Sequence, residues 1–203
     1  MHSGVFFGRV AETREVANRL RAMGSTGGIL AIVGPSGCGK SSLLNAAVVP
    51  LLGNDPAWLT VPPLVPGTDP LPELARALTA VANRLRLNWS ASDIRSRLEA
   101  GADGLLRVAD DLLAVSHNTC RRRLLITVDQ TEELFTRTTP VALERFAKLL
   151  SNAATSSVRV VAAMRSEFLD DLRDLPALVG VSIEAYVFPA GPKDVARRHR
   201  TAG

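Results

Sequence analysis

The chain has 203 residues, of which 46% are hydrophobic, and carries a formal net charge of +4 with two cysteines. This length and apolar fraction suit one domain with an ample core, and two cysteines exclude a disulfide framework, so we expect a reducing compartment. The sequence has no secretory leader and no apolar run of about 18 residues, so we predict a cytoplasmic protein without a membrane span.

In chain order, the predicted elements alternate between helices and strands. Apolar residues at helical spacing predict a helix over 10–23, and a partly β-branched run predicts a buried strand over 29–33. A Leu- and Ala-rich helix over 42–49 follows, which we expect Pro50 to end, and then a short edge strand over 58–65 that contains prolines. The remaining predictions are helices opening at Asp69 with Pro70 and at Thr139 with Pro140, helices over 90–100, 102–117 and 166–173, and strands over 124–128, 158–164 and 183–188.

This alternation favours an α/β fold, with a mostly parallel five-stranded sheet and helices on both faces. The most informative motif lies after the first strand and fits the pattern G-x-x-x-x-G-K-[ST], which roughly one percent of chains this long match by chance. A glycine loop between a strand and a helix turns its N–H groups into one concavity, which suits a polyphosphate. The loop and the residue after it are Gly34, Pro35, Ser36, Gly37, Cys38, Gly39, Lys40, Ser41 and Ser42.

The residues of this loop have separate expected roles. The glycines permit positive φ angles and close backbone approach. Lys40 is expected to reach the β- and γ-phosphates, and the Ser41 hydroxyl to bind Mg²⁺. Ser42 is assigned to the helix. Cys38 is interpreted as a small residue that fits the loop, and a redox-sensitive thiol at a helix N-terminus is the alternative.

A second candidate motif begins at Asp129, directly after the strand over 124–128. In phosphate-loop enzymes an Asp at this place holds Mg²⁺, often through water, whereas elsewhere it would be a turn or cap residue. Many such ATPases place Glu next, to activate the attacking water, but here Gln130 stands there and Gln is a poor base. Glu132 or Glu133 could act instead, or both could be solvated acids in the first turn of a helix, and the sequence leaves these interpretations level.

A third candidate, Arg165, follows the strand over 158–164. An Arg at the carboxyl end of the strand beside the Asp129 strand could contact the γ-phosphate. An ordinary surface Arg is the alternative.

The sequence contains a recognisable set of strings: Phe7-Gly8-Arg9, the phosphate loop, Pro66-Gly67 with Asp69-Pro70-Leu71, Asp129-Gln130-Thr131-Glu132-Glu133-Leu134-Phe135, and Met164-Arg165-Ser166-Glu167-Phe168. Together they resemble the STAND NTPases (signal-transduction ATPases with numerous domains), specifically the first of the novel STAND groups. The phosphate loop is generic, whereas the strings that begin at Asp129 and Arg165 are far more particular. The resemblance covers residues from about 6 to about 189.

The resemblance implies a sheet of order 5-1-4-3-2, in which the strands over 124–128 and 158–164 are adjacent. It implies ATP with Mg²⁺, and it implies that Phe7, Gly8 and Arg9 lie near the adenine while Arg165 senses the γ-phosphate. It also implies a switch, in which the nucleotide state controls signalling or assembly through protein partners or self-association.

We expect one nucleotide-binding domain over residues 1–189 and a short, basic, disordered tail over 190–203. Members of the family continue into a helical lid and carry effector domains in front, and this sequence shows neither. We therefore expect a truncated product, a disrupted remnant, or one module of a split system.

The sequence predicts Mg-ATP binding with slow hydrolysis as a regulatory switch. A nucleotide-binding interaction module that does not turn over is the alternative, suggested by Gln130 and by the missing lid. A GTPase is disfavoured because the guanine-reading string Asn-Lys-x-Asp is absent. A nucleic-acid ATPase is suggested by Arg121, Arg122 and Arg123 and by the basic tail. A solvated strand entry and a flexible terminus explain these features as well, and we predict no nucleic-acid partner.

Overall fold

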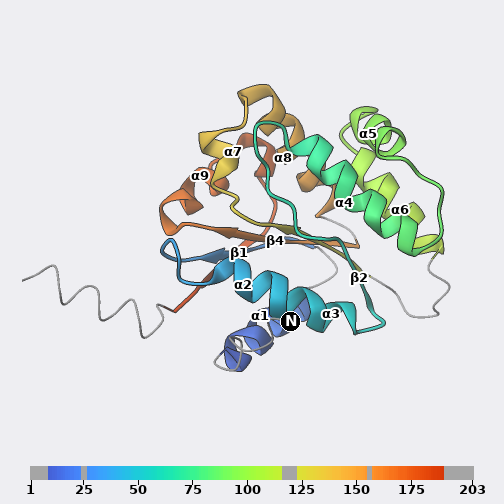
Figure 1. Cartoon of the computed structure of the whole chain (residues 1–203). Coiled ribbons are helices and arrows are strands. Elements are labelled where there is room, and N and C mark those ends of the chain that lie inside the picture. Colours follow the sequence, from blue (N-terminus) through green and yellow to red (C-terminus); the bar gives the residue numbers. More distant parts are fainter. Residues whose placement is uncertain (1–8, 24–26, 116–122, 155–156, 190–203) are drawn as a thin grey trace, which may run out of the picture.

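The computed structural model describes residues 9–23, 27–115, 123–154 and 157–189, and its centre is a five-stranded sheet (Figure 1). The strand order is β2-β3-β4-β1-β5, and every ladder between these strands is parallel. The predicted order 5-1-4-3-2 is therefore confirmed. The strands are β1 (Ile29–Val33), β2 (Trp58–Thr60), β3 (Arg123–Val128), β4 (Val158–Met164) and β5 (Ile183–Val187).

Helices cover both faces of the sheet, as predicted (Figure 1). One face carries α1 (Val10–Ala22), α2 (Lys40–Leu43) and α3 (Val49–Gly53), with the π-helical turn Leu44–Val48 between the last two. The opposite face carries α4 (Pro70–Arg84), α5 (Ala91–Glu99), α6 (Gly104–Val115), α7 (Glu133–Thr136), α8 (Pro140–Ala153) and α9 (Leu169–Arg173), together with the 3₁₀ turns Ser166–Phe168 and Pro176–Leu178.

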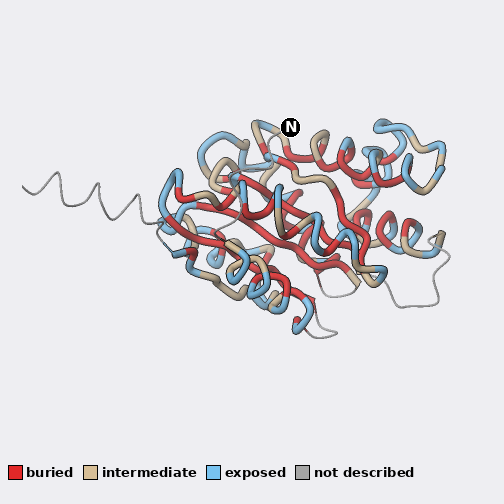
Figure 2. The backbone as a smooth tube through the Cα atoms, turned by 60° about the horizontal axis from the view of Figure 1, so that its bottom comes forward, coloured by how far each residue is buried: buried red, intermediate tan, exposed pale blue. Residues whose placement is uncertain are grey.

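The core has two layers because side chains alternate along each strand. In β1, Ile29, Ala31 and Val33 pack toward α4, α6 and α8, whereas Leu30 and Ile32 pack toward α1 and α2. All five residues of β1 are buried, as expected for a central parallel strand. Figure 2 shows buried segments running through the middle of the molecule, with the exposed residues on the surrounding helices and loops.

Two predicted helix starts are confirmed by their capping contacts. The Asp69 side chain accepts a hydrogen bond from the Leu71 N–H at the start of α4, and Thr139 accepts one from the Ala142 N–H at the start of α8. Both helices have proline at their first position, where no intrahelical N–H is needed. None of the described helices has the length and apolar character of a membrane span.

The prediction that Pro50 ends the helix after the phosphate loop is wrong. Helical structure continues through Gly53, because the turn Leu44–Val48 is wide and the Val49 N–H bonds to the Leu44 oxygen, five residues back. Proline inside an α-helix lacks an N–H and its ring clashes with the carbonyl four residues before it. A wide turn directly before Pro50 relieves this conflict, and the chain stays helical.

The predicted edge strand over 58–65 is shorter as a regular strand, because β2 ends at Thr60. Pro62 and Pro63 follow and have no N–H to donate to a ladder. The segment nevertheless stays beside β3, since the Leu64 N–H bonds to the Thr127 oxygen at 3.0 Å and the Leu64 oxygen accepts the Asp129 N–H at 2.8 Å. This contact fixes the backbone of Asp129 at the carboxyl end of the sheet.

Candidate nucleotide-binding site

The phosphate loop connects the end of β1 to the start of α2, as the sequence predicts. Gly37 and Gly39 have φ angles of 76° and 101°, which non-glycine residues rarely adopt. A Cβ atom at Gly34 would lie 3.3 Å from the Phe188 carbonyl oxygen, so this glycine permits close approach to the chain after β5. The three glycines thus shape a loop that opens at the N-terminus of α2.

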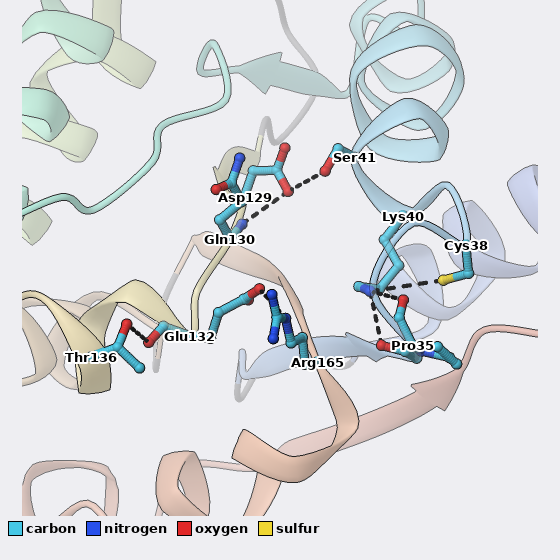
Figure 3. A network of polar contacts seen from close by, with 10 residues as sticks. Pro35, Cys38, Lys40, Ser41, Asp129, Gln130, Glu132, Thr136 and Arg165 are labelled. Carbon is cyan, nitrogen blue, oxygen red and sulfur yellow. Dashed lines mark hydrogen bonds and ion pairs between the residues drawn. The ribbon is translucent and has the colours of Figure 1, made fainter.

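Lys40 is held over this loop by backbone oxygens. Its Nζ donates to the Gly34 and Pro35 carbonyl oxygens, each at 2.8 Å, and lies 3.7 Å from Cys38 Sγ (Figure 3). The side chain is only 9% exposed. Its ammonium group is therefore placed inside the concavity rather than extended into solvent.

Ser41 and Asp129 meet although 88 positions separate them in the sequence. The Ser41 hydroxyl donates to Asp129 Oδ1 at 2.8 Å, and the Gln130 N–H donates to the same oxygen at 2.9 Å (Figure 3). Asp129 is 5% exposed, so its carboxylate is aimed into the site and not into solvent. A hydroxyl and a carboxylate side by side are the hard oxygen donors that Mg²⁺ prefers, so these two residues fit the predicted metal role.

A pocket of about 400 Å³ joins the loop to the carboxyl ends of β3 and β4. Its walls are predominantly polar, as a polyphosphate requires. Ser42, which the sequence assigned to the helix, lies in α2 and also lines the pocket. The lining residues are Ser36, Gly37, Gly39, Lys40, Ser41, Ser42, Asp129, Gln130, Glu132, Ala163 and Arg165.

The turn after Asp129 directs Glu132 into this pocket. Gln130 has a φ angle of 49°, and the Thr131 N–H donates to the Ala163 oxygen at 2.9 Å, which ties the turn to β4. Figure 3 shows Glu132 and Arg165 pointing toward one another, with Oε1 and Nε 3.5 Å apart. The second oxygen of Glu132 is buried and has no hydrogen-bond partner among the described residues. Glu132 therefore lines the pocket with one carboxylate oxygen paired to Arg165 and one that is buried and has no partner among the described residues.

Glu133 lies outside the lining of the pocket. Its Oε2 accepts the Gly67 N–H at 3.1 Å, and its Oε1 accepts from Arg137 at 3.1 Å. Thr138 Oγ1 donates to the Gly67 carbonyl oxygen at 2.7 Å, so both polar backbone groups of this glycine are held from the same segment. The structure thus separates the two glutamates that the sequence left equivalent, one toward the pocket and one toward the loop before α4.

Arg9 lies beside the phosphate loop on the β5 side, but it does not line the pocket. Its guanidinium group donates to the Cys38 and Pro189 carbonyl oxygens, each at 3.2 Å, and lies 4.2 Å from the centroid of the Phe188 ring. Phe7 and Gly8 lie outside the described residues. Sequence reasoning missed Phe188, which is 1% exposed and contacts both Arg9 and the loop. Its position at the end of the last predicted strand was the available signal.

A family sequence model described as Novel STAND NTPase 1 matches residues 1–196. The chain belongs to that family. This assignment agrees with the resemblance found in the sequence. A search of curated proteins gave no match.

Two solved structures share the fold of this Novel STAND NTPase 1 member. The Walker-type ATPase PABY2304 of Pyrococcus abyssi superposes with a TM-score of 0.58 at 15% identity, over 97% of this chain and 59% of its own. The ORC2 protein of Aeropyrum pernix, solved as ADPNP–ADP complexes, gives a TM-score of 0.59 at 15% identity, over 96% and 52%. The chain therefore spans between half and three fifths of the length of these structures. The family match makes this chain a STAND-type NTPase module, and the likeness to the solved structures shows the P-loop fold.

Proposed function

We propose that this chain binds Mg-ATP in the pocket beside the phosphate loop and hydrolyses it slowly, so that its nucleotide state acts as a regulatory switch for protein partners. The observation that carries the proposal is the Ser41–Asp129 contact, because it joins the two halves of a magnesium site next to Lys40. The choice of ATP over GTP rests on the absence of a guanine-reading string in the sequence. The cytoplasmic location and the absence of a nucleic-acid partner stay predictions.

Phosphate binding falls to the loop and to Lys40. The N–H groups at the start of α2 and the lysine ammonium group favour negative charge in the concavity. Ser41 and Asp129 would hold Mg²⁺, which neutralises charge on the phosphates when bound. Arg9 connects the loop to the chain after β5, and its position beside Cys38 supports a role in shaping the adenine side of the site.

For hydrolysis we assign the water-activating role to Glu132 and not to Glu133. Glu132 lines the pocket and has a carboxylate oxygen without a partner among the described residues, whereas both oxygens of Glu133 are hydrogen-bonded outside the pocket. Arg165, which is paired with Glu132 in the same pocket, can stabilise the charge that develops on the γ-phosphate. Gln130 can orient water but cannot take its proton.

A nucleotide-binding module that does not turn over is the second candidate. The Glu132–Arg165 ion pair favours it, because each group neutralises the other and neither is free to act while they are paired. In this candidate, nucleotide binding alone would change the interaction surface.

Phosphate release and thermal unfolding separate these candidates. ATP at about 100 times its Kd adds about 2.7 kcal/mol to the stability of a protein that binds it, which raises Tm by roughly 5–10 °C for a domain of this size. We expect this shift in the wild type and its loss in Lys40→Ala. Phosphate release above the Lys40→Ala background, lost in Asp129→Asn, supports hydrolysis. A Tm shift without phosphate release supports the second candidate. The absence of both the Tm shift and the phosphate release would refute nucleotide binding at this site.

A further inference from the structure

The strings that begin at Asp129 and Arg165 contain one repeated spacing that the proposed chemistry leaves unexplained. Each string has a charged residue in the pocket and a phenylalanine three positions later, Glu132 with Phe135 and Arg165 with Phe168. In both cases the phenylalanine N–H bonds to the carbonyl oxygen of the charged residue, at 3.1 Å and 3.2 Å. Each charged residue is thus joined to its phenylalanine by one closed turn.

The two phenylalanine rings contact each other. Their centroids are 6.1 Å apart and their planes differ by 12°, which is an offset stacked arrangement. Both side chains are only partly buried, and they pack on the outer side of the core layer that faces α8. The segments after β3 and β4 are therefore joined twice, once by the Glu132–Arg165 ion pair and once by the ring stack.

We propose that Phe135 and Phe168 are a positioning pair for the hydrolysis step, which sets the separation of the Glu132 carboxylate from the Arg165 guanidinium group around the γ-phosphate. This inference rests on the proposed function, because it assigns these two charged groups to the reacting phosphate and its water. The ion pair must open to admit a phosphate, and during this opening the ring stack keeps the two turns aligned. Offset rings with nearly parallel planes can slide without losing contact, so the stack permits a limited separation.

A purely structural role predicts different behaviour. If the rings served only to fill the core, their loss would lower stability and leave the chemistry of the folded enzyme unchanged. Phe146 offers the matched control, since it is a fully buried phenylalanine of the same core layer, on α8 and outside the pocket lining. Phe146→Leu should lower Tm at least as much as Phe135→Leu or Phe168→Leu.

The test measures kcat, KM and ATP affinity for Phe135→Leu, Phe168→Leu, the double variant and Phe146→Leu, with Tm as a check of folding. We expect each single variant at the stack to lower kcat about tenfold, because small misplacements of catalytic groups have large effects, while the Kd for ATP stays within about twofold. The double variant should be no slower than the worse single variant, since both remove one shared contact. Phe135→Tyr keeps the ring and should restore kcat to within about twofold of the wild type.

The pair is refuted if both leucine variants keep the wild-type kcat, if Phe146→Leu lowers kcat as much as they do, or if Phe135→Tyr is as slow as Phe135→Leu. It is also refuted if ATP affinity falls in step with kcat. A wild type that releases no more phosphate than Lys40→Ala has a different meaning, because that result removes the hydrolysis step itself. The failure of the positioning pair and the failure of the proposed hydrolysis are thus distinguished by the wild-type rate.

Discussion

Glu132→Gln and Glu133→Gln form a pair of neighbouring, chemically identical changes for which the structure predicts very different effects on kcat. A positioned general base contributes about 10²–10⁴-fold to a rate, and an amide cannot replace it. Glu132→Gln should therefore lower kcat by about 10²-fold or more. Its effect on stability should stay below about 1 kcal/mol, because its ion pair is with a half-exposed arginine and is screened by solvent.

Glu133 should behave in the opposite way. The Glu133 carboxylate accepts a hydrogen bond from the Gly67 N–H, and a hydrogen bond to a charged group contributes about 1.5–3 kcal/mol to stability. Its ion pair with the exposed Arg137 adds less than about 1 kcal/mol. Glu133→Ala should thus lower stability by about 2–3 kcal/mol and Tm by roughly 4–12 °C. Glu133→Gln keeps an oxygen for Gly67 and should lose only about 1 kcal/mol.

The assay is steady-state phosphate release at saturating Mg-ATP, at a temperature where differential scanning fluorimetry shows every variant to be folded. Glu133→Gln should retain kcat within about threefold of the wild type. Equal loss of kcat in the two glutamine variants, or a larger loss in Glu133→Gln, would refute the assignment of Glu132. A large fall of Tm in Glu132→Gln with none in Glu133→Ala would refute the contacts on which the contrast rests.

Three other predictions use different parts of the molecule. A Cβ at Gly104 would lie 2.4 Å from the Arg97 carbonyl oxygen, so Gly104→Ala should destabilise the protein by about 1–3 kcal/mol or more. A Cβ at Gly101 would meet only the ends of two flexible side chains, so Gly101→Ala should change stability far less; chemical denaturation measures both. Arg9→Ala removes two hydrogen bonds and a cation–π contact beside the phosphate loop, so it should weaken ATP binding by roughly tenfold, and Arg9→Lys should not restore the affinity. An unchanged affinity in calorimetry would contradict this prediction. Chelation of Mg²⁺ should remove most of the ATP-induced rise of Tm in the wild type, and Asp129→Asn should show little rise with or without the metal. An unchanged rise of Tm in the wild type after chelation of Mg²⁺ would exclude the Ser41–Asp129 metal site.

Much of the fold could be predicted from the sequence because its strands are buried on both faces. Such strands are nearly continuous apolar runs, as in β1 and β4, and they are recognisable without knowledge of their neighbours. The helix starts at Asp69 and Thr139 were also predictable from local sequence, since capping depends on residues close to each other in the chain. Pro50 was misjudged because the local rule for proline holds only if the preceding turn is α-helical, and that turn is wide.

The candidate site was predictable only as a set of residues. Its motifs identified Lys40, Ser41, Asp129 and Arg165, and the structure brings all four to one pocket. Glu133 differs from Glu132 in its hydrogen bond from the Gly67 N–H, 66 positions away, and no local pattern reveals such a partner. Gln130, in the turn before the two glutamates, has a left-handed backbone, and a non-glycine residue with positive φ is rarely predictable from its type.

The two cationic side chains of the pocket, Lys40 and Arg165, differ in the charge of the groups that they contact. Lys40 is bound to neutral carbonyl oxygens, so an incoming phosphate meets its full positive charge and competes only with dipoles. Arg165 is bound to a carboxylate, so a phosphate must compete with an anion to reach it. If the site binds nucleotides as proposed, a nucleoside diphosphate would occupy the loop without disturbing Arg165, whereas a third phosphate would have to displace Glu132 from Arg165. The pocket would then distinguish a diphosphate from a triphosphate by whether the Glu132–Arg165 ion pair survives. Salt screens that pair and would therefore reduce the difference between the two nucleotide-bound states.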